Sequence, residues 1–185
     1  NPCPMIEPKP ELKQKEILFA GTVIPRKGYA DLIRGFSKIA SSFPDWKVVI
    51  AGNGEIDKAK AIAKECGIEK QVVFLGWVNG KAKDLAFQRA SIYCLASDGE
   101  GFPMGVLDAW AYGIPCVVTP VGGLPDIVVD GENALVFPVG DVDVLARQLE
   151  RMISDDELRE KIAKASLELA HTTFNIDCIN KKMED

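Results

Sequence analysis

Two carboxylates, Glu100 and Asp108, flank a turn that leads into an apolar, helix-forming segment. Gly99 and Gly101 let the backbone of this turn come close to a ligand. Pro103 suits the first turn of a helix, where its missing N–H is not needed. The pattern favours a site for a ligand that carries both hydroxyl and phosphate groups.

The separation of the two acids limits the chemistry that they can do together. On a helix, Asp108 lies about 12 Å beyond Glu100, and the eight residues make about 2.2 turns, so both acids lie on similar faces. Acids that far apart do not share a proton, so an acid–base pair is not expected. We expect them to hold different parts of one long ligand, with the amides of Phe102, Met104 and Gly105 between them. The alternative is that Asp108 is a solvated helix residue.

The composition of the chain excludes several classes of function. Its 185 residues are enough for one domain with a real core. The content of 47% hydrophobic and 26% charged residues is typical of a soluble globular protein. The net charge of −5 argues against general nucleic-acid binding. No apolar run approaches the roughly 18 residues of a membrane span, and no signal peptide is visible.

The cysteines and the single histidine indicate no redox or metal chemistry. Five cysteines are scattered without a CxxC pair, which favours a reducing, cytoplasmic compartment. Cys94 and Cys116 lie in apolar strand patterns, where a free cysteine acts as a small hydrophobe. His171 is expected to stabilise the end of a helix. No set of residues has the spacing of metal ligands, so no metal is expected.

Short apolar runs alternate with helical patterns along most of the chain, as is typical of strands buried on both faces of a parallel sheet. Strands are expected at residues 17–20, 46–51, 72–75, 92–95, 116–119 and 134–137. Helices are expected at residues 29–43, 56–66, 82–90, 104–112, 142–153 and 157–170. Asp141 is expected to cap the fifth helix, and Ser154 with Glu157 to form a capping box for the sixth. The alternation predicts an α/β fold, a Rossmann-like doubly wound parallel sheet of about six strands flanked by helices.

The two ends of the chain differ from this pattern. Residues 1–15 contain four prolines and are expected to form a linker or an extended entry segment. Residues 16–173 are expected to form the ligand-binding domain. Residues 174–185 are expected to be the start of a crossover helix that is cut short.

Ligands of doubly wound sheets bind beyond the carboxyl ends of the strands, so the loops that follow the strands are the candidate sites. The first of these loops begins at Gly21 and places Arg26 and Lys27 near a helix N-terminus. A helix N-terminus already favours anions, and two cations beside it suit a diphosphate. The alternative is an exposed basic pair without a ligand.

The segment Gly52–Asn53–Gly54 follows the second expected strand. Its G-x-G pattern ends at Asp57 and does not follow the first strand, so it is not a dinucleotide-binding motif. A tight turn is favoured, and a backbone contact to a ligand remains open.

Two further loops have alternative interpretations. Trp77 either faces a nucleobase or packs at the rim on Val78. Gly122 and Gly123 either lie near a phosphate or serve a turn that backbone geometry requires.

An ordered set of motifs covers about residues 16–170. The motifs are Gly21 to Lys27–Gly28, Gly52–Asn53–Gly54, Val72 to Gly76, Ala96–Ser97–Asp98–Gly99–Glu100–Gly101–Phe102, Leu107–Asp108–Ala109 to Cys116–Val117–Val118, Gly122–Gly123–Leu124–Pro125–Asp126 and Asp130 to Pro138. Together they resemble the C-terminal, nucleotide-sugar-binding half of retaining glycosyltransferases of the GT-B fold, family 4, also called group 1.

The resemblance implies roles for individual residues. Glu100 would contact the donor sugar, Asp108 would hold the ribose hydroxyls, and Lys27 would neutralise the diphosphate leaving group. Stabilisation of that charge would be the main catalytic effect, with Glu100 and Lys27 as the catalytic residues. No cofactor is implied beyond the donor substrate, a UDP- or GDP-sugar. The implied donor contacts are Gly21, Arg26, Lys27, Gly52, Trp77, Glu100, Gly101, Phe102, Pro103, Met104, Gly105 and Asp108.

The chain departs from the family pattern at four positions. Asp108 stands where the family usually has Glu, and Thr22 where it often has Arg. Ala96 replaces the usual Pro, and Ala134 the usual Gly. We expect binding to survive these changes.

The full fold of this family has a second domain that holds the acceptor. The chain is therefore expected to be one half of a larger enzyme and to be inactive without its N-terminal domain. Its partners would be the donor and that domain, with membrane contact only through the missing domain and an acceptor from polysaccharide or lipid-linked glycan assembly. The alternatives are a nucleotide-sugar epimerase-like enzyme and a non-catalytic nucleotide-sugar-binding module.

Overall fold

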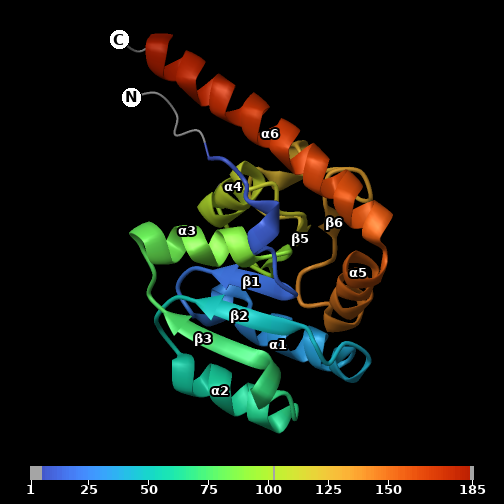
Figure 1. Cartoon of the computed structure of the whole chain (residues 1–185). Helices are drawn as coiled ribbons and strands as arrows, with labels where there is room; N and C mark the ends of the chain where they lie inside the picture. Colours follow the sequence, from blue (N-terminus) through green and yellow to red (C-terminus); the bar gives the residue numbers. More distant parts are fainter. Residues whose placement is uncertain (1–5, 102, 184–185) are drawn as a thin grey trace.

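The computed structural model describes residues 6–101 and 103–183, with side chains up to residue 172. Six parallel strands form one sheet in the order β3-β2-β1-β4-β5-β6 (Figure 1). The chain builds outward from β1 to β3 and then returns to the other side of β1 with β4. This confirms the predicted doubly wound sheet, and the point where its order reverses lies between β1 and β4.

The strands and helices have the following bounds. The strands are β1 (Glu16–Ala20), β2 (Lys47–Ala51), β3 (Val72–Gly76), β4 (Ile92–Leu95), β5 (Cys116–Val118) and β6 (Leu135–Val136). The α-helices are α1 (Tyr29–Ser37), α2 (Ile56–Glu65), α3 (Gly80–Arg89), α4 (Met104–Ala111), α5 (Val142–Ser154) and α6 (Asp156–Met183). The short 3-10 helices are η1 (Pro10–Leu12), η2 (Pro25–Lys27), η3 (Ala40–Ser42), η4 (Glu69–Gln71) and η5 (Leu124–Asp126).

Helices cover both faces of the sheet. Ile17 and Phe19 of β1 face the layer of α1, α2 and α5, while Leu18 between them faces α3 and α4. This follows from the alternation of side chains along a strand. Helix α6 packs on both α5 and α4 and so passes along the edge between the two layers (Figure 1).

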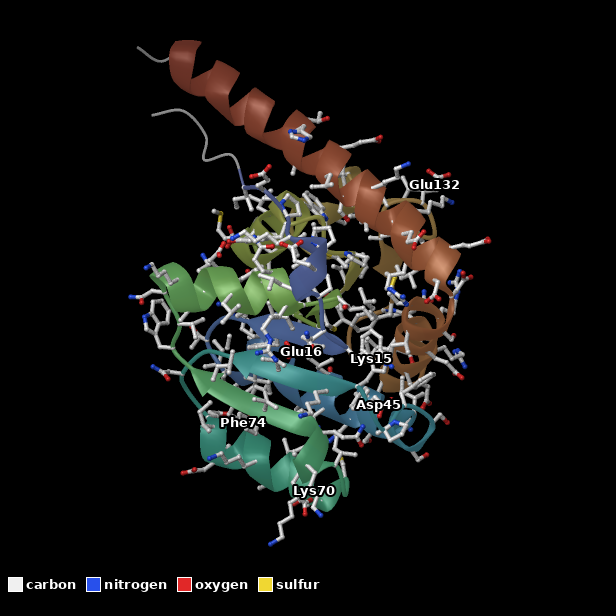
Figure 2. The ribbon with its side chains drawn as sticks, in the orientation of Figure 1. Lys15, Glu16, Asp45, Lys70, Phe74 and Glu132 are labelled. Carbon is white, nitrogen blue, oxygen red and sulfur yellow. The ribbon has the colours of Figure 1, made fainter. Side chains whose placement is uncertain are left out.

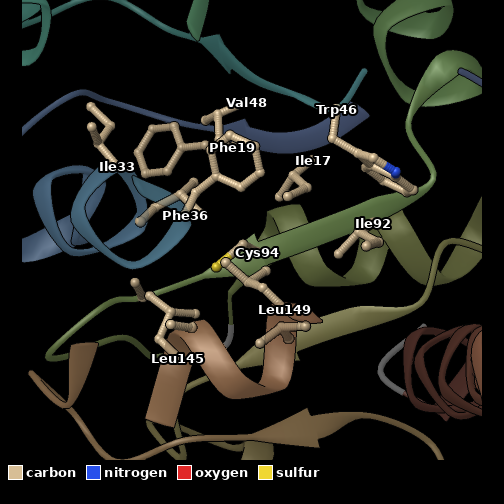
Figure 3. Packing of buried hydrophobic residues seen from close by; sticks show 14 of the residues in the cluster. Ile17, Phe19, Ile33, Phe36, Trp46, Val48, Ile92, Cys94, Leu145 and Leu149 are labelled. Atoms are coloured by element: carbon tan, nitrogen blue, oxygen red, sulfur yellow. The ribbon is translucent and has the colours of Figure 1, made fainter. Parts of the chain in front are cut away.

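The larger core cluster lies between β1, β2, β4 and the helices α1 and α5. Its members are apolar and almost fully buried, so the sheet is held by removal of apolar surface from water. The residues labelled in Figure 3 are Ile17, Phe19, Ile33, Phe36, Trp46, Val48, Ile92, Cys94, Leu145 and Leu149.

The N-terminal segment is docked on α3 from Ile6 onward. Gln88 accepts a hydrogen bond from the Lys9 amide at 2.9 Å and donates one to the Glu7 carbonyl at 3.1 Å. The Lys13 ammonium donates to the carbonyl of Ala90 at 2.7 Å, and burial lowers the pKa of Lys13 to about 8. The segment predicted as a linker is thus held against the domain over its described part.

Ion pairs lie around the start of β1, at the edge of the sheet opposite the loops predicted to bind a ligand. Lys15 and Asp45 pair at 3.6 Å across β1 and the chain that leads into β2 (Figure 2). Glu16 accepts from Arg89 at 2.7 Å and so joins β1 to the end of α3. Both contacts are structural, since they lie at the amino ends of their strands.

Two predicted helix ends were wrong, the C-terminal end of α1 and the N-terminal cap of α6. Helix α1 ends at Ser37, and the 3-10 helix η3 follows it. Phe43 precedes a proline, which disfavours helix at that position, so the predicted end at residue 43 was too late. Ser154 does not cap α6, because it stays in α5 and its hydroxyl donates to the Glu150 carbonyl at 2.6 Å. Asp155 takes the capping role and accepts from the Leu158 amide at 3.0 Å.

Two other details of the helices also differ from expectation, while one is confirmed. Helix α6 continues past His171 to Met183, so His171 is an exposed residue within a helix and not at its end. Pro103 precedes α4 as its N-cap residue and is not the first helical residue. Asp141 caps α5 by accepting from the Val144 amide at 3.0 Å, as predicted. Over the described residues, no helix combines the length and the apolar character that a membrane crossing requires.

Replacement of Asp155 by alanine tests the observed cap. We expect Asp155→Ala to lower the free energy of unfolding by about 1 kcal/mol, because the amides at the start of α6 lose their acceptor. Ser154→Ala is the control, and we expect it to change stability less, because its hydroxyl is not a cap. Urea denaturation followed by circular dichroism measures both, and a larger loss for Ser154→Ala would contradict the observed boundary.

Candidate functional site

A pocket of about 600 Å³ opens at the carboxyl edge of the sheet, where the strand order reverses. Its walls come from the ends of β1 and β4, from α3 and from the start of α4. Most of the predicted donor contacts line it: Gly21, Lys27, Gly52, Trp77, Glu100, Pro103, Met104, Gly105 and Asp108. Within the described part of the chain, Arg26 and Gly101 lie outside this lining, and Phe102 lies outside the described residues.

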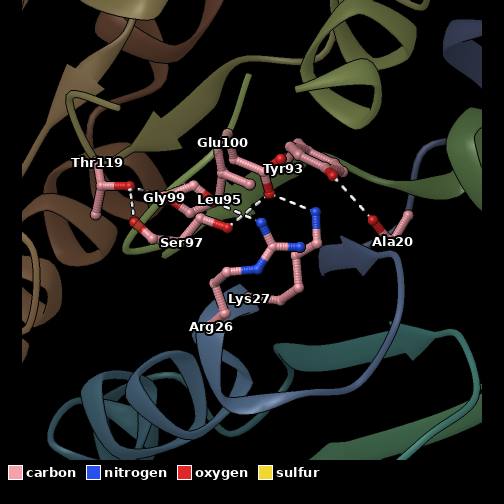
Figure 4. Close-up of polar contacts among 9 residues, drawn as sticks. All are labelled: Ala20, Arg26, Lys27, Tyr93, Leu95, Ser97, Gly99, Glu100 and Thr119. Atoms are coloured by element: carbon pink, nitrogen blue, oxygen red, sulfur yellow. Dashed lines mark hydrogen bonds and ion pairs between the residues drawn. The ribbon is translucent and has the colours of Figure 1, made fainter. Parts of the chain in front are cut away.

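Lys27 and Glu100 form an ion pair inside the pocket (Figure 4). Lys27 comes from the loop after β1 and Glu100 from the loop after β4, so the two neighbouring strands bring them together. Glu100 also accepts a hydrogen bond from the Ser97 hydroxyl at 2.8 Å. Its side chain is only 10% exposed, so the pair is well shielded from water.

The surroundings of Glu100 favour its charged form. Burial by itself raises the pKa of Glu100, but the hydrogen bonds from Lys27 and Ser97 and the charges of Lys27 and Arg26 outweigh it. The pKa of Glu100 is therefore below its ordinary value. A carboxylate in this state accepts hydrogen bonds and does not donate a proton.

A second, buried contact holds the loop that carries Glu100. The hydroxyl of Thr119, after β5, donates to the Ser97 carbonyl at 2.6 Å (Figure 4). Both Ser97 and Thr119 are fully buried. The orientation of Glu100 thus depends on two hydroxyl groups that do not reach the pocket.

Arg26 supports the neighbouring loop. Its guanidinium donates to the Gly99 carbonyl at 3.4 Å, and its own carbonyl accepts from the Asp98 amide at 3.0 Å. Arg26 is exposed and its charge lies close enough to Glu100 to affect it. Its predicted contact with a diphosphate stays a prediction.

The start of α4 forms the wall next to the ion pair. The first N–H groups of a helix have no partner inside the helix, and Met104 and Gly105 line the pocket with this turn. A Cβ atom at Gly105 would lie 2.1 Å from the Tyr93 hydroxyl, which donates to the Ala20 carbonyl at 3.2 Å. Glycine at this position therefore lets α4 approach β4 and β1.

Asp108 lies one turn further along α4 and also faces the pocket. Its carboxylate pairs with the ammonium of Lys83 on α3 at 3.1 Å, and its side chain is 30% exposed. Asp108 is therefore not a solvated helix residue but part of a second ion pair in the same pocket. Its predicted contact with ribose stays a prediction.

The Gly52–Asn53–Gly54 segment, where a tight turn was expected, forms a bend and a β-bridge from Gly54 to Val23, and Gly52 lines the pocket. A Cβ atom at Gly52 would lie 1.8 Å from the Gly21 carbonyl oxygen. The Asn53 side chain accepts from the Trp77 amide at 3.1 Å and so fixes the loop after β3. The Trp77 ring is 70% exposed at the pocket and is free of the core.

The glycine pair after β5 serves the backbone. The Gly123 amide donates to the Gly101 carbonyl at 3.1 Å, and a Cβ atom at Gly122 would lie 1.8 Å from the same oxygen. This contact ties the loop after β5 to the loop that carries Glu100. It favours the structural interpretation of these glycines and explains why Gly101 packs beside the pocket without lining it.

No role was predicted from the sequence for four residues that shape the site: Lys83, Tyr93, Ser97 and Thr119. Ser97 stands three residues before Glu100, so its spacing offered a hint. Lys83 and Tyr93 act across elements whose packing no local pattern gives. Among the residues that the structure describes, no cluster of His, Cys, Asp or Glu is arranged to hold a metal ion.

Comparison with known proteins identifies the family. The family "Glycosyl transferases group 1" matches residues 5–168. The chain belongs to this family. An uncharacterized glycosyltransferase of Methanocaldococcus jannaschii is 33% identical over 91% of the chain and 43% of its own length. The chain spans less than half the length of the curated relatives that it matches first.

Solved glycosyltransferase structures share the fold of this domain. The C-terminal domain of a glycosyl transferase group 1 family protein, LpcC, from Francisella tularensis has a TM-score of 0.79 and 27% identity, over 89% of this chain and 88% of that chain. Anabaena HepE, solved in complex with UDP-glucose, has a TM-score of 0.83 over 92% of this chain and 48% of that chain. At 21% sequence identity, the similarity to HepE shows a shared fold alone. The domain thus has the fold of the C-terminal half of GT-B glycosyltransferases.

Replacement of Gly52 tests the close contact below the pocket. In this glycosyltransferase domain we expect Gly52→Ala to lower the free energy of unfolding by about 1–3 kcal/mol, because the added methyl group meets the Gly21 backbone. Gly99→Ala is the matched control, since nothing lies within 4 Å of a Cβ atom at Gly99. Chemical denaturation measures both, and equal stability of the two variants would contradict the close approach.

Replacement of Ser97 tests the charge state of Glu100. We expect Ser97→Ala to raise the pKa of Glu100, because the carboxylate loses one hydrogen-bond donor. A lowered pKa stabilises the fold above the unfolded-state pKa, and this contribution is lost as the pH falls through the folded-state pKa. Carbon-detected NMR titration of the Glu100 carboxyl reports the shift. Ser91→Ala, at the amino edge of the sheet, should leave it unchanged, and an unmoved or lowered pKa in Ser97→Ala would argue against the contact.

Proposed function

We propose that this domain binds the nucleoside diphosphate part of a nucleotide sugar, such as a UDP- or GDP-sugar. In the whole enzyme, the sugar passes to an acceptor with retention of the anomeric configuration. The observation that carries the proposal is the Lys27–Glu100 pair at the start of α4, in one pocket with Asp108. The volume of about 600 Å³ suits a ligand of this size.

The diphosphate belongs at the start of α4. Unpaired helix amides and the helix dipole favour an anion there, and the ammonium of Lys27, which pairs with Glu100, lies beside them. When the glycosidic bond breaks, negative charge grows on the departing diphosphate. Lys27 and the amides of Met104 and Gly105 are already in place to stabilise that charge, which is the main catalytic effect proposed.

The donor sugar, the ribose and the base contact other residues that line the pocket. Glu100 accepts hydrogen bonds from the hydroxyls of the donor sugar, since its lowered pKa keeps it ionised. Asp108 accepts from the ribose hydroxyls, four residues or about 6 Å further along α4. The exposed ring of Trp77 at the rim is available to pack against the base.

The acceptor belongs to a second domain in this proposal. The chain spans less than half the length of the curated relatives that it matches first, and the GT-B fold consists of two such domains. We place the reaction in the cytoplasm. The free thiols of Cys66, Cys94 and Cys116 support a reducing compartment for the described part of the chain.

Calorimetric titration of the domain with UDP, GDP and ADP tests the proposal. We expect one of these diphosphates to bind more tightly than its monophosphate and its nucleoside. Lys27→Met should weaken the diphosphate by about tenfold to a hundredfold and the nucleoside hardly at all, because the lost hydrogen bond is to a charged group.

Lys81→Met is the matched control, because Lys81 is exposed on α3 and does not line the pocket. It should bind as the wild type does. The proposal fails if none of the three diphosphates binds, or if Lys27→Met weakens nucleoside and diphosphate equally.

A further inference from the structure

Lys83, the cation of the second ion pair of the pocket, has no role in the function proposed above. The Lys83 ammonium lies 3.1 Å from Oδ2 of Asp108, and both residues line the pocket. The two side chains are 46% and 30% exposed, so the pair is open to a ligand from one side. It joins α3 to α4, two helices that lie on the same face of the sheet.

Lys83 is held in place by the helix that carries it. Its ammonium lies 5.9 Å from the ring centre of Phe87, which is buried and stacks on Tyr93 and Tyr112. The Tyr112 hydroxyl, at the end of α4, donates to Asp84 beside Lys83 at 2.7 Å. Two cross-helix contacts thus fix the separation of α3 and α4, and the Lys83 ammonium lies near both Asp108 and the Phe87 ring.

The two lysines of the pocket lie at different positions along α4. Lys27 pairs with Glu100 next to the first turn of α4, where the proposed diphosphate lies. Lys83 pairs with Asp108 about 6 Å further along the helix, beyond that first turn. Lys83 is therefore placed for the part of the ligand that Asp108 meets and not for the phosphates.

A carboxylate has two oxygens and about four acceptor positions. Among the described residues, Lys83 is the one ion-pair partner of Asp108, and it contacts Oδ2, so further acceptor positions remain on a carboxylate that lines the pocket. The two vicinal hydroxyls of a ribose are two donors that match these positions. An Asp side chain without a fixed partner loses rotamer freedom on binding such a diol, whereas the paired Asp108 is already oriented.

We propose that Lys83 is a positioning residue for ribose: it holds Asp108 so that the carboxylate receives both ribose hydroxyls, and it thereby sets the preference for ribonucleotides over deoxyribonucleotides. The inference rests on the proposed function, and it concerns the specificity of the domain for the ribose of the nucleotide. Lys83 itself touches neither the sugar that is transferred nor the diphosphate.

A cycle of protein and ligand changes tests this role. The domain is titrated with UDP and with 2′,3′-dideoxy-UDP, and with the GDP pair if GDP is the diphosphate that binds. We expect Lys83→Met to weaken the ribo form by about three- to tenfold and to leave the dideoxy form nearly unchanged. Lys83→Arg keeps a cation beside Asp108 and should restore most of the preference.

Further variants separate this role from a general effect on the pocket. In the Asp108→Asn background, Lys83→Met should no longer change the ratio of ribo to dideoxy affinity, and Lys81→Met should match the wild type throughout. Equal weakening of both ligands by Lys83→Met would overturn the inference, because it would mean that Lys83 acts on the diphosphate or on the fold. An unchanged ratio would overturn it too. Failure of the wild type to bind any diphosphate would instead reject the proposed function.

Discussion

The site depends on one contact between two loops, the loop after β1 and the loop after β4. Gly28 approaches the second loop so closely that a Cβ atom there would lie 2.0 Å from the Ala96 carbonyl oxygen. The Asp98 amide donates to the Arg26 carbonyl across the same contact. Because β1 and β4 are neighbours at the point where the strand order reverses, this contact brings Lys27 to Glu100 and places both beside the first turn of α4. The ion pair is thus a product of the topology as much as of the two side chains.

Local sequence patterns predicted the sheet and the order of its elements. They also predicted those pocket residues that lie in the loops directly after the strands. Lys27 and Glu100 were found in this way, because loops that follow neighbouring parallel strands meet at one edge. Lys83 was missed, because its contact with Asp108 depends on how α3 packs beside α4, and Phe87 and Tyr112 set that packing. The role of Thr119 was missed for the same reason, since its hydroxyl acts on Ser97 from another strand. The prediction of a helix end failed where two possible N-cap residues are adjacent, as with Ser154 and Asp155, because either side chain is able to cap the helix.

The electrostatics of the pocket follow from pairing. Each of its two carboxylates faces one ammonium, so the walls carry opposite charges at short range while the chain as a whole is acidic. The pairs differ in exposure: Glu100 is 10% exposed, and Asp108 is 30% exposed. The inner pair is also bound by Ser97, whereas the outer pair is more exposed. A ligand that carries both anionic and hydroxyl groups therefore meets one ion pair that is shielded from water and one that is half-open to it.

The base of the pocket and its rim differ in how well they tolerate substitution. At the base, Gly52 approaches the Gly21 backbone so closely that a side chain there disturbs the fold. At the rim, Trp77 is 70% exposed and Met104 is 67% exposed, and neither ring nor thioether is packed into the core. Substitutions at the rim are therefore expected to cost little folding stability, whereas Gly52 tolerates almost no side chain. The rim can thus vary in sequence while the domain keeps its fold.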